Sequence, residues 1–235
     1  MYKSIYLARR NPAFTAEQFH ERWKQHSALT GTTQRIRPHF TQVVQCARFD
    51  DVVAPGATAE YDGANLLGLV RRESGYAVFD EPEHRDIMLL DELATFAGPI
   101  RDCTLVTKEQ VCKEGGFSRF LILRFLKFDA SGDREEQIAR WSSLQSIRDR
   151  DGPHAPLVCR SVTNLVVEPP PTAMDFDLVT ETWFADAASL GRHANDRDVR
   201  AQIDEAINAL CDPARTITFA ARVNHSRPPL EDNPA

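Results

Sequence analysis

The sequence predicts an α+β fold made of two successive β-α-β-β-α-β units in one chain of 235 residues. Segments with alternating or β-branched residues are separated by segments in which apolar residues recur at helical spacing. The same order of segments then occurs a second time. Motifs also recur at a nearly constant interval, since Asp62 recurs 115 residues later as Asp177 and Trp23 recurs 118 residues later as Trp141. The alternative explanation is chance similarity between two amphipathic layouts of the same class.

The first unit begins with an alternating strand, and Asn11-Pro12 marks the turn into the first helix. Thr15 and Gln18 form the capping-box pattern at the start of this helix. Gly31 is expected to end it, because glycine readily takes the left-handed conformation found at helix ends. The unit is predicted to contain strands over residues 2–9, 39–49, 61–71 and 101–111, and helices over residues 15–31 and 82–97.

A seam at Glu114-Gly115-Gly116 separates the first unit from the second. In the second unit, Asp133 and Glu136 again form a cap pattern before a helix. The unit is predicted to contain strands over residues 117–128, 157–168, 176–184 and 215–223, and helices over residues 133–150 and 199–210. The chain is therefore divided into residues 1–114, residues 115–225 and a loose tail over residues 226–235.

The order of elements in each unit is that of a ferredoxin-like fold, in which two helices cover one face of a four-stranded sheet. The apolar stripe Ile87, Leu90 and Ala94 is expected to bury the second helix of the first unit. The other face of each sheet must be buried as well. We therefore expect the two units to pack sheet to sheet as a pseudo-dimer within one chain.

The composition excludes several classes of function. The net charge of −6 leaves no basic excess for binding nucleic acid. No apolar run is long enough to span a membrane, and no signal peptide is recognised, so a cytoplasmic location without membrane contact is expected. The five cysteines include no C-x-x-C pair, which argues against disulfides and against a zinc site. Neither a metal nor a cofactor is expected.

The first helix carries the candidate general acid/base. Phe19, Trp23 and His26 share one helix face, and the two large apolar residues predict that this face is buried. His26 is then either a hydrogen-bonded core histidine or a catalytic group at the edge of an apolar pocket. With the tryptophans in register, His26 corresponds to Leu144, so only the first unit is expected to be catalytic, with the second structural.

Asp62 is predicted to be the carboxylate that assists His26, because it begins a strand in an apolar neighbourhood. The alternative is a carboxylate that caps a turn, which Asp177 at the matching position favours. Tyr61, His39 and Trp23 are expected to contribute to substrate binding. The histidines in charged surroundings, His84 and His193, are expected at the surface.

The segment FTAEQFHERWKQHSALTG after Ala-Arg-Arg resembles the EthD family, in which a Phe-x-x-x-Trp-x-x-His helix follows a strand that ends in arginine. YDGANLLGL resembles the Tyr-Asp-Gly strand of that family, DELATF before Ile100-Arg101 resembles its Asp-Glu-x-x-Phe segment, and RPHFTQVV is a weaker match to its second strand. The resemblance covers residues 2–111 and is degenerate over residues 117–225. It implies a dimeric α/β-barrel fold that binds small hydrophobic or aromatic molecules.

Relatives of that family include dehydratases, decarboxylases, cyclases, cofactor-free monooxygenases and haem enzymes, so the resemblance does not choose a reaction. The first hypothesis is a cofactor-independent lyase of dehydratase or decarboxylase type in the metabolism of aromatic compounds. His26 would be its general acid/base and Asp62 its assisting carboxylate. The second hypothesis is a cofactor-free or haem-dependent monooxygenase, and the third is a non-catalytic binding protein. A homodimer is possible in each case.

Overall fold

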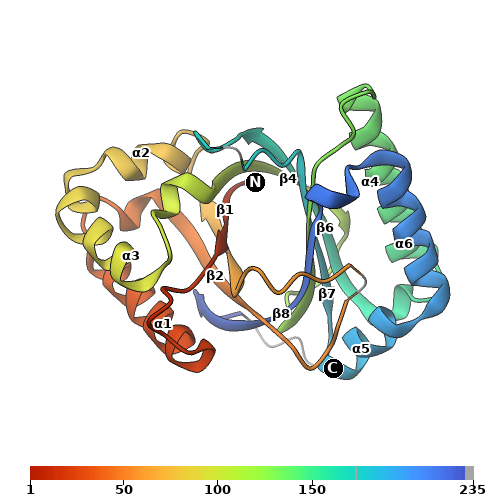
Figure 1. The fold of residues 1–235 in the computed structure, drawn as a ribbon, viewed down its shortest axis with the longest axis horizontal. Coiled ribbons are helices and arrows are strands. Elements are labelled where there is room, and N and C mark those ends of the chain that lie inside the picture. The colour runs from red at the N-terminus through yellow and green to blue at the C-terminus, as the bar shows by residue number, and fades with distance from the viewer. Residues whose placement is uncertain (55, 173, 231–235) are drawn as a thin grey trace.

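A computed structural model describes residues 1–54, 56–172 and 174–230, and its centre is a closed barrel of eight antiparallel strands (Figure 1). The strands are β1 (Tyr2–Ala8), β2 (Phe40–Arg48), β3 (Gly63–Leu69), β4 (Thr104–Lys113), β5 (Phe120–Leu126), β6 (Val158–Glu168), β7 (Leu178–Phe184) and β8 (Ile217–Arg227). The helices are α1 (Ala16–Thr32), α2 (Ser74–Asp80), α3 (Leu89–Thr95), α4 (Arg134–Asp151), α5 (Ala187–Asn195) and α6 (Arg197–Leu210). Helices α1–α3 lie on one side of the barrel and α4–α6 on the other.

The strands follow the order β1-β3-β2-β8-β5-β7-β6-β4 around the barrel. Within it, β4-β1-β3-β2 come from the first half and β8-β5-β7-β6 from the second. The expectation that two sheets pack face to face is wrong, because β2 pairs with β8 and β4 pairs with β6 along their edges. Edge pairing satisfies backbone groups that stacked sheets would leave unpaired. This α+β barrel is consistent with a dimeric α/β-barrel fold.

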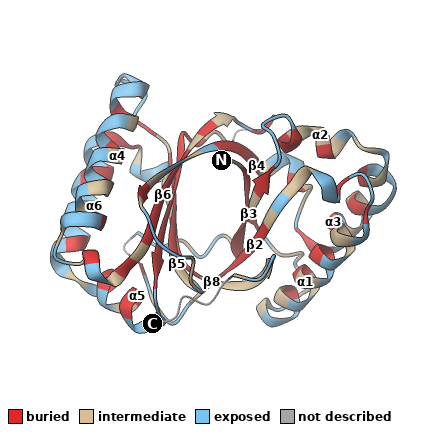
Figure 2. Ribbon diagram, turned by 180° about the vertical axis from the view of Figure 1, so that it is seen from behind, coloured by how far each residue is buried: buried red, intermediate tan, exposed pale blue. Residues whose placement is uncertain are grey.

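Alternate residues of each strand face the barrel interior or the helices. On β1, Ile5 and Leu7 belong to the apolar cluster inside the barrel, whereas Tyr6 packs with Phe19 and Trp23 of α1. Figure 2 shows the strands largely buried, while the outward faces of the helices are exposed. The spaces that can hold a site therefore lie between the outer face of the strands and the helices.

Helix α1 begins as the sequence predicts. The side chain of Thr15 accepts a hydrogen bond from the backbone of Gln18, and the side chain of Gln18 accepts one from the Thr15 backbone in return. The prediction that Gly31 ends the helix is wrong. The helix continues to Thr32, and extended Thr33 ends it by donating its N–H to the carbonyl of Thr30. No left-handed residue is needed because this closing turn bonds directly to the backbone.

The segment predicted as one helix over residues 82–97 is a π-helical turn, His84–Met88, followed by α3. The predicted apolar stripe lies on the wrong face, because Leu90 is 69% exposed. Ile87 and Ala94 are also exposed. The buried face carries Met88 and the polar residues Glu92 and Thr95. Hydrophobic periodicity fails here because the buried polar residues are hydrogen-bonded, Glu92 to His84 and Thr95 to the carbonyl of Asp91.

In the second half, Asp133 caps α4 by accepting a hydrogen bond from the backbone of Glu136, as predicted. Helix α6 buries Val199 and Ile203, also as predicted. Helices α2 and α5 were not predicted. The predicted tail starts too early, since Ser226 and Arg227 belong to β8, and residues 231–235 lie outside the described part of the chain. No helix in the described ranges is both long and apolar enough to cross a membrane.

Candidate active site

A cavity of about 60 Å³ lies between the outer face of the first-half strands and helices α1–α3. Ser4 and Tyr6 from β1, Asn65 from β3 and Thr104 from β4 form its floor. The walls come from α1, α2, the π-helical turn and α3. The wall residues include His26, Ser27, Thr30, Ile36, Phe40, Gly75, Val78, Phe79, His84, Met88, Glu92 and Ile100. A mixed apolar and polar lining of this kind suits a small organic molecule with a polar group.

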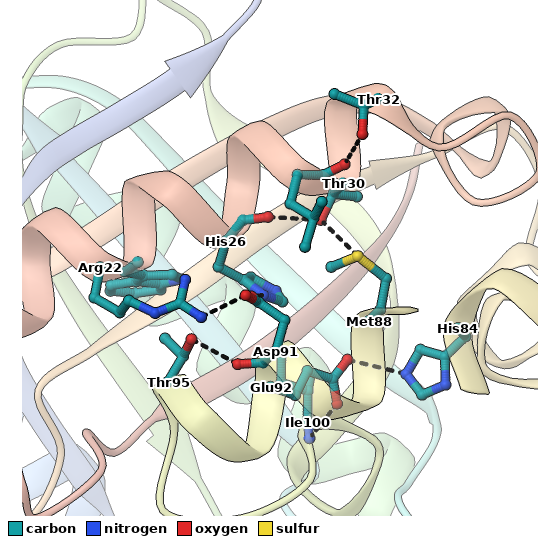
Figure 3. A network of polar contacts seen from close by, with 12 residues as sticks. Arg22, His26, Thr30, Thr32, His84, Met88, Asp91, Glu92, Thr95 and Ile100 are labelled. Atoms are coloured by element: carbon teal, nitrogen blue, oxygen red, sulfur yellow. Dashed lines mark hydrogen bonds and ion pairs between the residues drawn. The ribbon is translucent and has the colours of Figure 1, made fainter. Parts of the chain in front are cut away.

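His26 lies in this wall and is 6% exposed. Its Nδ1 lies 2.7 Å from a carboxylate oxygen of Asp91, and Arg22 binds the other oxygen of the same carboxylate (Figure 3). The edge of the ring contacts Phe96, with centroids 5.2 Å apart. Burial acts to raise the pKa of Asp91, but hydrogen bonds from His26 and Arg22 outweigh it and lower that pKa. Asp91 therefore stays ionised and fixes the orientation of the imidazole.

A second histidine–carboxylate pair faces the same cavity. Nε2 of His84 lies 2.9 Å from Oε1 of Glu92, and both side chains are buried. The other oxygen of Glu92 accepts the backbone N–H of Ile100 at 3.3 Å. The prediction that His84 lies at the surface is wrong, because the π-helical turn directs its ring inward against Phe79. The cavity therefore contains two imidazoles, each held by its own carboxylate.

The floor of the cavity adds hydrogen-bonding groups. The Tyr6 hydroxyl accepts hydrogen bonds from Asn65 at 2.9 Å and from Nε1 of Trp23 at 3.3 Å. Burial raises the pKa of Tyr6, so its hydroxyl stays protonated at neutral pH. The buried Oδ1 of Asn65 and Oγ of Ser4 have no hydrogen-bond partner among the described residues. These two oxygens are available to a bound molecule.

The predicted pairing of His26 with Asp62 is wrong. The two carboxylate oxygens of Asp62 accept hydrogen bonds from the Arg10 backbone N–H, at 2.8 Å, and from the Arg10 guanidinium. The backbone of Asp62 also bridges β1 and β2, through the Ala8 carbonyl and the Arg48 N–H. Asp177 makes the same type of contact in the second half, where it binds the Phe128 N–H. Asp62 thus links the segment that follows β1 to the residue that precedes β3.

The other predicted binding residues also lie outside this cavity. The Tyr61 ring lies against the Arg9 guanidinium, whose Cζ is 5.0 Å from the centroid of that ring. Tyr61 lines a separate cleft. Nε2 of His39 lies 3.5 Å from a carboxylate oxygen of Glu81. Trp23 is buried beneath the floor, where it supports Tyr6. Of the five predicted site residues, His26 alone lines the cavity.

Sequence reasoning missed Asp91, His84 and Glu92. Asp91 and Glu92 begin the DELATF segment, whose resemblance to the EthD family assigned neither residue a role in the site. The sequence did contain one indication of these residues. Met88, Glu92 and Thr95 share a helix face by their spacing, and polar residues beside a methionine on one face can indicate that the face lines a cavity. The stronger apolar stripe on the opposite face obscured it.

The size of the cavity limits what it can hold. Benzene binds in buried cavities of about 150 Å³, so this cavity of about 60 Å³ must expand to admit an aromatic ring. A haem group does not fit, because a porphyrin is far larger still. Within the described residues, no group of three or more histidine, cysteine or acidic side chains is placed to hold a metal ion.

Comparisons with known proteins give similarity in structure but not in sequence. No protein-family profile and no curated protein matches the sequence. An anthrone oxidase-like protein is similar over 96% of this chain and 91% of its own, with a TM-score of 0.65 and 7% identity. A proposed monooxygenase from Fusobacterium nucleatum is similar over 96% of this chain and 93% of its own, with a TM-score of 0.59 and 6% identity. A proposed monooxygenase from Lactobacillus acidophilus is similar over 96% of this chain and 94% of its own, with a TM-score of 0.55 and 8% identity. At these identities the likeness shows a shared fold alone.

Proposed function

We propose that this protein is a proton-transfer enzyme, a cofactor-independent lyase that acts on a small hydrophobic or aromatic molecule. The observation that carries the proposal is the presence of two buried histidine–carboxylate pairs, His26–Asp91 and His84–Glu92, in the wall of one cavity. An elimination needs one group to remove a proton and another to protonate the leaving group. Two separately held imidazoles meet both requirements.

His26 is the proposed general base. Asp91 accepts a hydrogen bond from Nδ1–H, which leaves the lone pair of the neutral imidazole on Nε2. Among the described residues Nε2 of His26 has no hydrogen-bond partner, so it is available to a proton of the substrate. The negative charge of Asp91 also stabilises the imidazolium that forms when that proton is taken. Arg22 keeps Asp91 in place by binding its second oxygen.

His84 is the proposed general acid. Its Nε2 is held by Glu92, so it can donate a proton through Nδ1 when the ring is charged. A hydroxyl group that leaves the substrate near His84 would depart as water. The Asn65 and Ser4 oxygens in the floor would orient the substrate while both transfers occur.

A cofactor-free monooxygenase is the second candidate, and the structural similarity to an anthrone oxidase-like protein and two proposed monooxygenases favours it. In this reaction, the first step would again be removal of a proton by His26. The carbanion produced would then react with molecular oxygen instead of expelling a leaving group. The two candidates therefore share the base and differ in the fate of the carbanion.

The test is hydrogen–deuterium exchange followed by NMR in D₂O, with a panel of small aryl ketones, β-hydroxy ketones and anthrones. Wild-type protein should exchange the acidic carbon-bound proton of at least one compound, and His26→Ala should not. Loss of the hydroxyl group identifies the lyase, while oxygen uptake at an electrode identifies the monooxygenase. Equal binding by both proteins without exchange would refute catalysis and leave a binding protein.

We further infer that the two halves derive from one duplicated ferredoxin-like unit of EthD type. Support comes from the neighbour order β4-β1-β3-β2, which recurs as β8-β5-β7-β6, and from Asp62 and Asp177, which cap corresponding strands. The division at residues 1–114 and 115–225 follows the connection between β4 and β5. A homodimer stays a prediction, which light scattering would check.

A further inference from the structure

The second half contains a buried polar cluster in the layer between its strands and helices. Arg124 on β5 faces this layer, because its neighbours Leu123 and Phe125 belong to the apolar cluster inside the barrel. Arg124 is the fifth residue of β5, as Tyr6 is the fifth residue of β1. It therefore occupies in the second half the place where Tyr6 forms the floor of the cavity in the first.

The surroundings of Arg124 are rich in hydroxyl groups. The strand register places Thr180 and Thr218 on either side of it. Thr182, two residues beyond Thr180 on β7, lies opposite Ser161 of β6. All of these side chains are buried. The hydroxyls of Ser161, Thr182 and Thr218 have no hydrogen-bond partner among the described residues. His193 of α5 lies in the same layer, with its ring 4.9 Å from that of Phe184.

The Arg124 side chain is 1% exposed, and its Nε and Nη2 have no hydrogen-bond partner among the described residues. These two nitrogens lie on the same edge of the guanidinium, and that edge binds two oxygens of a carboxylate or a phosphate side by side. Both ring nitrogens of His193 are unpaired among the described residues as well. Burying a charged group without a partner costs several kcal/mol, so this edge is a strong candidate for an interaction with an anion.

The nearby side chains do not neutralise Arg124. Asp149 is buried close by, but it accepts a hydrogen bond from Nε of Arg148 at 2.9 Å, and its other oxygen has no partner in the described ranges. Asp204 interacts with Arg124 from the exposed face of α6. Burial, followed by repulsion from Arg148, lowers the pKa of Arg124 to about 9, so the guanidinium is still charged at neutral pH. The carboxylate of Asp149 is therefore bonded to Arg148, and no carboxylate among the described residues is hydrogen-bonded to the Nε–Nη2 edge of Arg124.

His193 contributes hydrogen bonding without charge. Burial lowers the pKa of His193 to about 3, and the positive charges of Arg124 and Arg148 add to this effect. His154, whose ring centroid lies 6.3 Å from that of His193, lowers this pKa further. The negative charge of Asp196 acts in the opposite direction and raises it. A neutral imidazole donates one hydrogen bond and accepts one. At neutral pH His193 can therefore bind a ligand oxygen as a donor.

We propose that the second half binds a small oxyanion of carboxylate or phosphate type, with the Nε–Nη2 edge of Arg124 as its main contact. The hydroxyls of Thr182 and Thr218 and the ring of His193 are the additional donors. The second half would thus have a binding site of its own, where the sequence predicts only a structural role.

Isothermal titration with inorganic phosphate and with acetate, at constant ionic strength balanced with chloride, tests this site. Wild-type protein should bind at least one of the two saturably with one site per chain, and the more strongly bound anion identifies the ligand class. Arg124→Gln should weaken that binding at least tenfold. Arg150→Gln removes the same charge from the exposed end of α4 and should leave binding unchanged.

Two further variants keep the test decisive. If Arg124→Gln does not fold, Thr218→Val and His193→Gln should each weaken binding while leaving the circular dichroism spectrum unchanged. His26→Ala should bind the anion as the wild type does, which separates this site from the proposed catalytic one. The proposal is overturned if wild-type protein shows no saturable binding up to tens of millimolar. It is also overturned if the folded Arg124, Thr218 and His193 variants bind as the wild type does.

Discussion

Nδ1 of His26 lies 2.7 Å from a carboxylate oxygen of Asp91, although the two residues are 65 positions apart in the chain. This contact joins α1 to α3 (Figure 3). Arg22, one turn before His26 on α1, binds the same carboxylate. The two helices are thus linked by an arginine–carboxylate–histidine chain in which the histidine alone faces the cavity.

Replacing His26 by alanine should lower the exchange or turnover rate by about 10²–10⁴-fold, which is the usual contribution of a positioned general base. The fold should persist, because the Phe19–Trp23 packing of α1 is untouched. The matched control is His20→Ala on the same helix, outside the cavity, which should keep wild-type activity. Full activity in the His26 variant would disprove the assignment.

Asp91→Asn and Asp62→Asn should behave differently. Asp91→Asn allows the imidazole to turn or to adopt the wrong tautomer, so kcat should fall by about 10²-fold with KM little changed. Asp62→Asn breaks the contact with Arg10 and should cost about 1–3 kcal/mol of unfolding free energy while kcat is retained. Steady-state kinetics and urea unfolding of both variants check this contrast, and the reverse pattern would restore the pairing of His26 with Asp62.

His84→Gln should remove one limb of the pH–rate profile. The glutamine can keep a hydrogen bond to Glu92 but cannot deliver a proton, so the rate should no longer fall when the acid group becomes deprotonated at high pH. The remaining rate should be about 10²-fold lower. A bell-shaped profile identical to that of the wild type would show that His84 is only structural.

Met88→Ala should enlarge the cavity, because Met88 is buried in its wall. We expect a loss of about 2–5 kcal/mol in unfolding free energy together with tighter binding of benzene-sized ligands. Leu90→Ala is the control on the adjacent turn, since Leu90 is largely exposed and its loss should change stability by less than about 0.5 kcal/mol. Urea unfolding and ligand titration measure both effects. Weaker ligand binding by the Met88 variant would argue against this cavity as the substrate site.

Unfolding free energy should decrease on acidification because of a buried network inside the barrel. Burial acts to raise the pKa of Glu181, but Lys3 at 2.6 Å outweighs it and lowers that pKa below the ordinary 4.5. A lowered folded-state pKa contributes stability above pH 4.5, and that contribution is lost as the pH falls through the folded value. The raised pKa of Lys3 affects stability only at alkaline pH. Its contribution to the unfolding free energy is complete below pH 10.5 and is lost as the pH rises through the folded-state pKa.

Urea unfolding between about pH 7 and pH 3 would measure this acid-induced loss. Glu181→Gln should flatten the dependence below pH 4.5, although it also lowers stability at neutral pH because Lys3 loses one of its two carboxylate partners. Glu17→Gln, at the exposed start of α1, is the control and should leave most of the dependence in place. An unchanged slope in the Glu181 variant would contradict the prediction.

The sequence by itself determined the features that depend on near neighbours in the chain. The capping box of Thr15 and Gln18 and the buried face of Phe19, Trp23 and His26 follow from contacts within one or two helical turns. The eight strands are predictable for the same reason, because alternation of side chains is a local property. Only their ends differ by a few residues from the predicted bounds.

The tertiary structure decided which distant groups meet. Asp62 and Asp91 are both carboxylates in plausible positions, and only the packing of α3 on α1 places Asp91 beside His26. The inward direction of His84 and the burial of Arg124 depend on the same layer between helices and strands. Local periodicity assigns polar residues to the surface, whereas a closed barrel covered by helices can bury them wherever a partner or a cavity is present. The chemistry of this chain therefore depends on contacts that hydrophobic patterning does not encode.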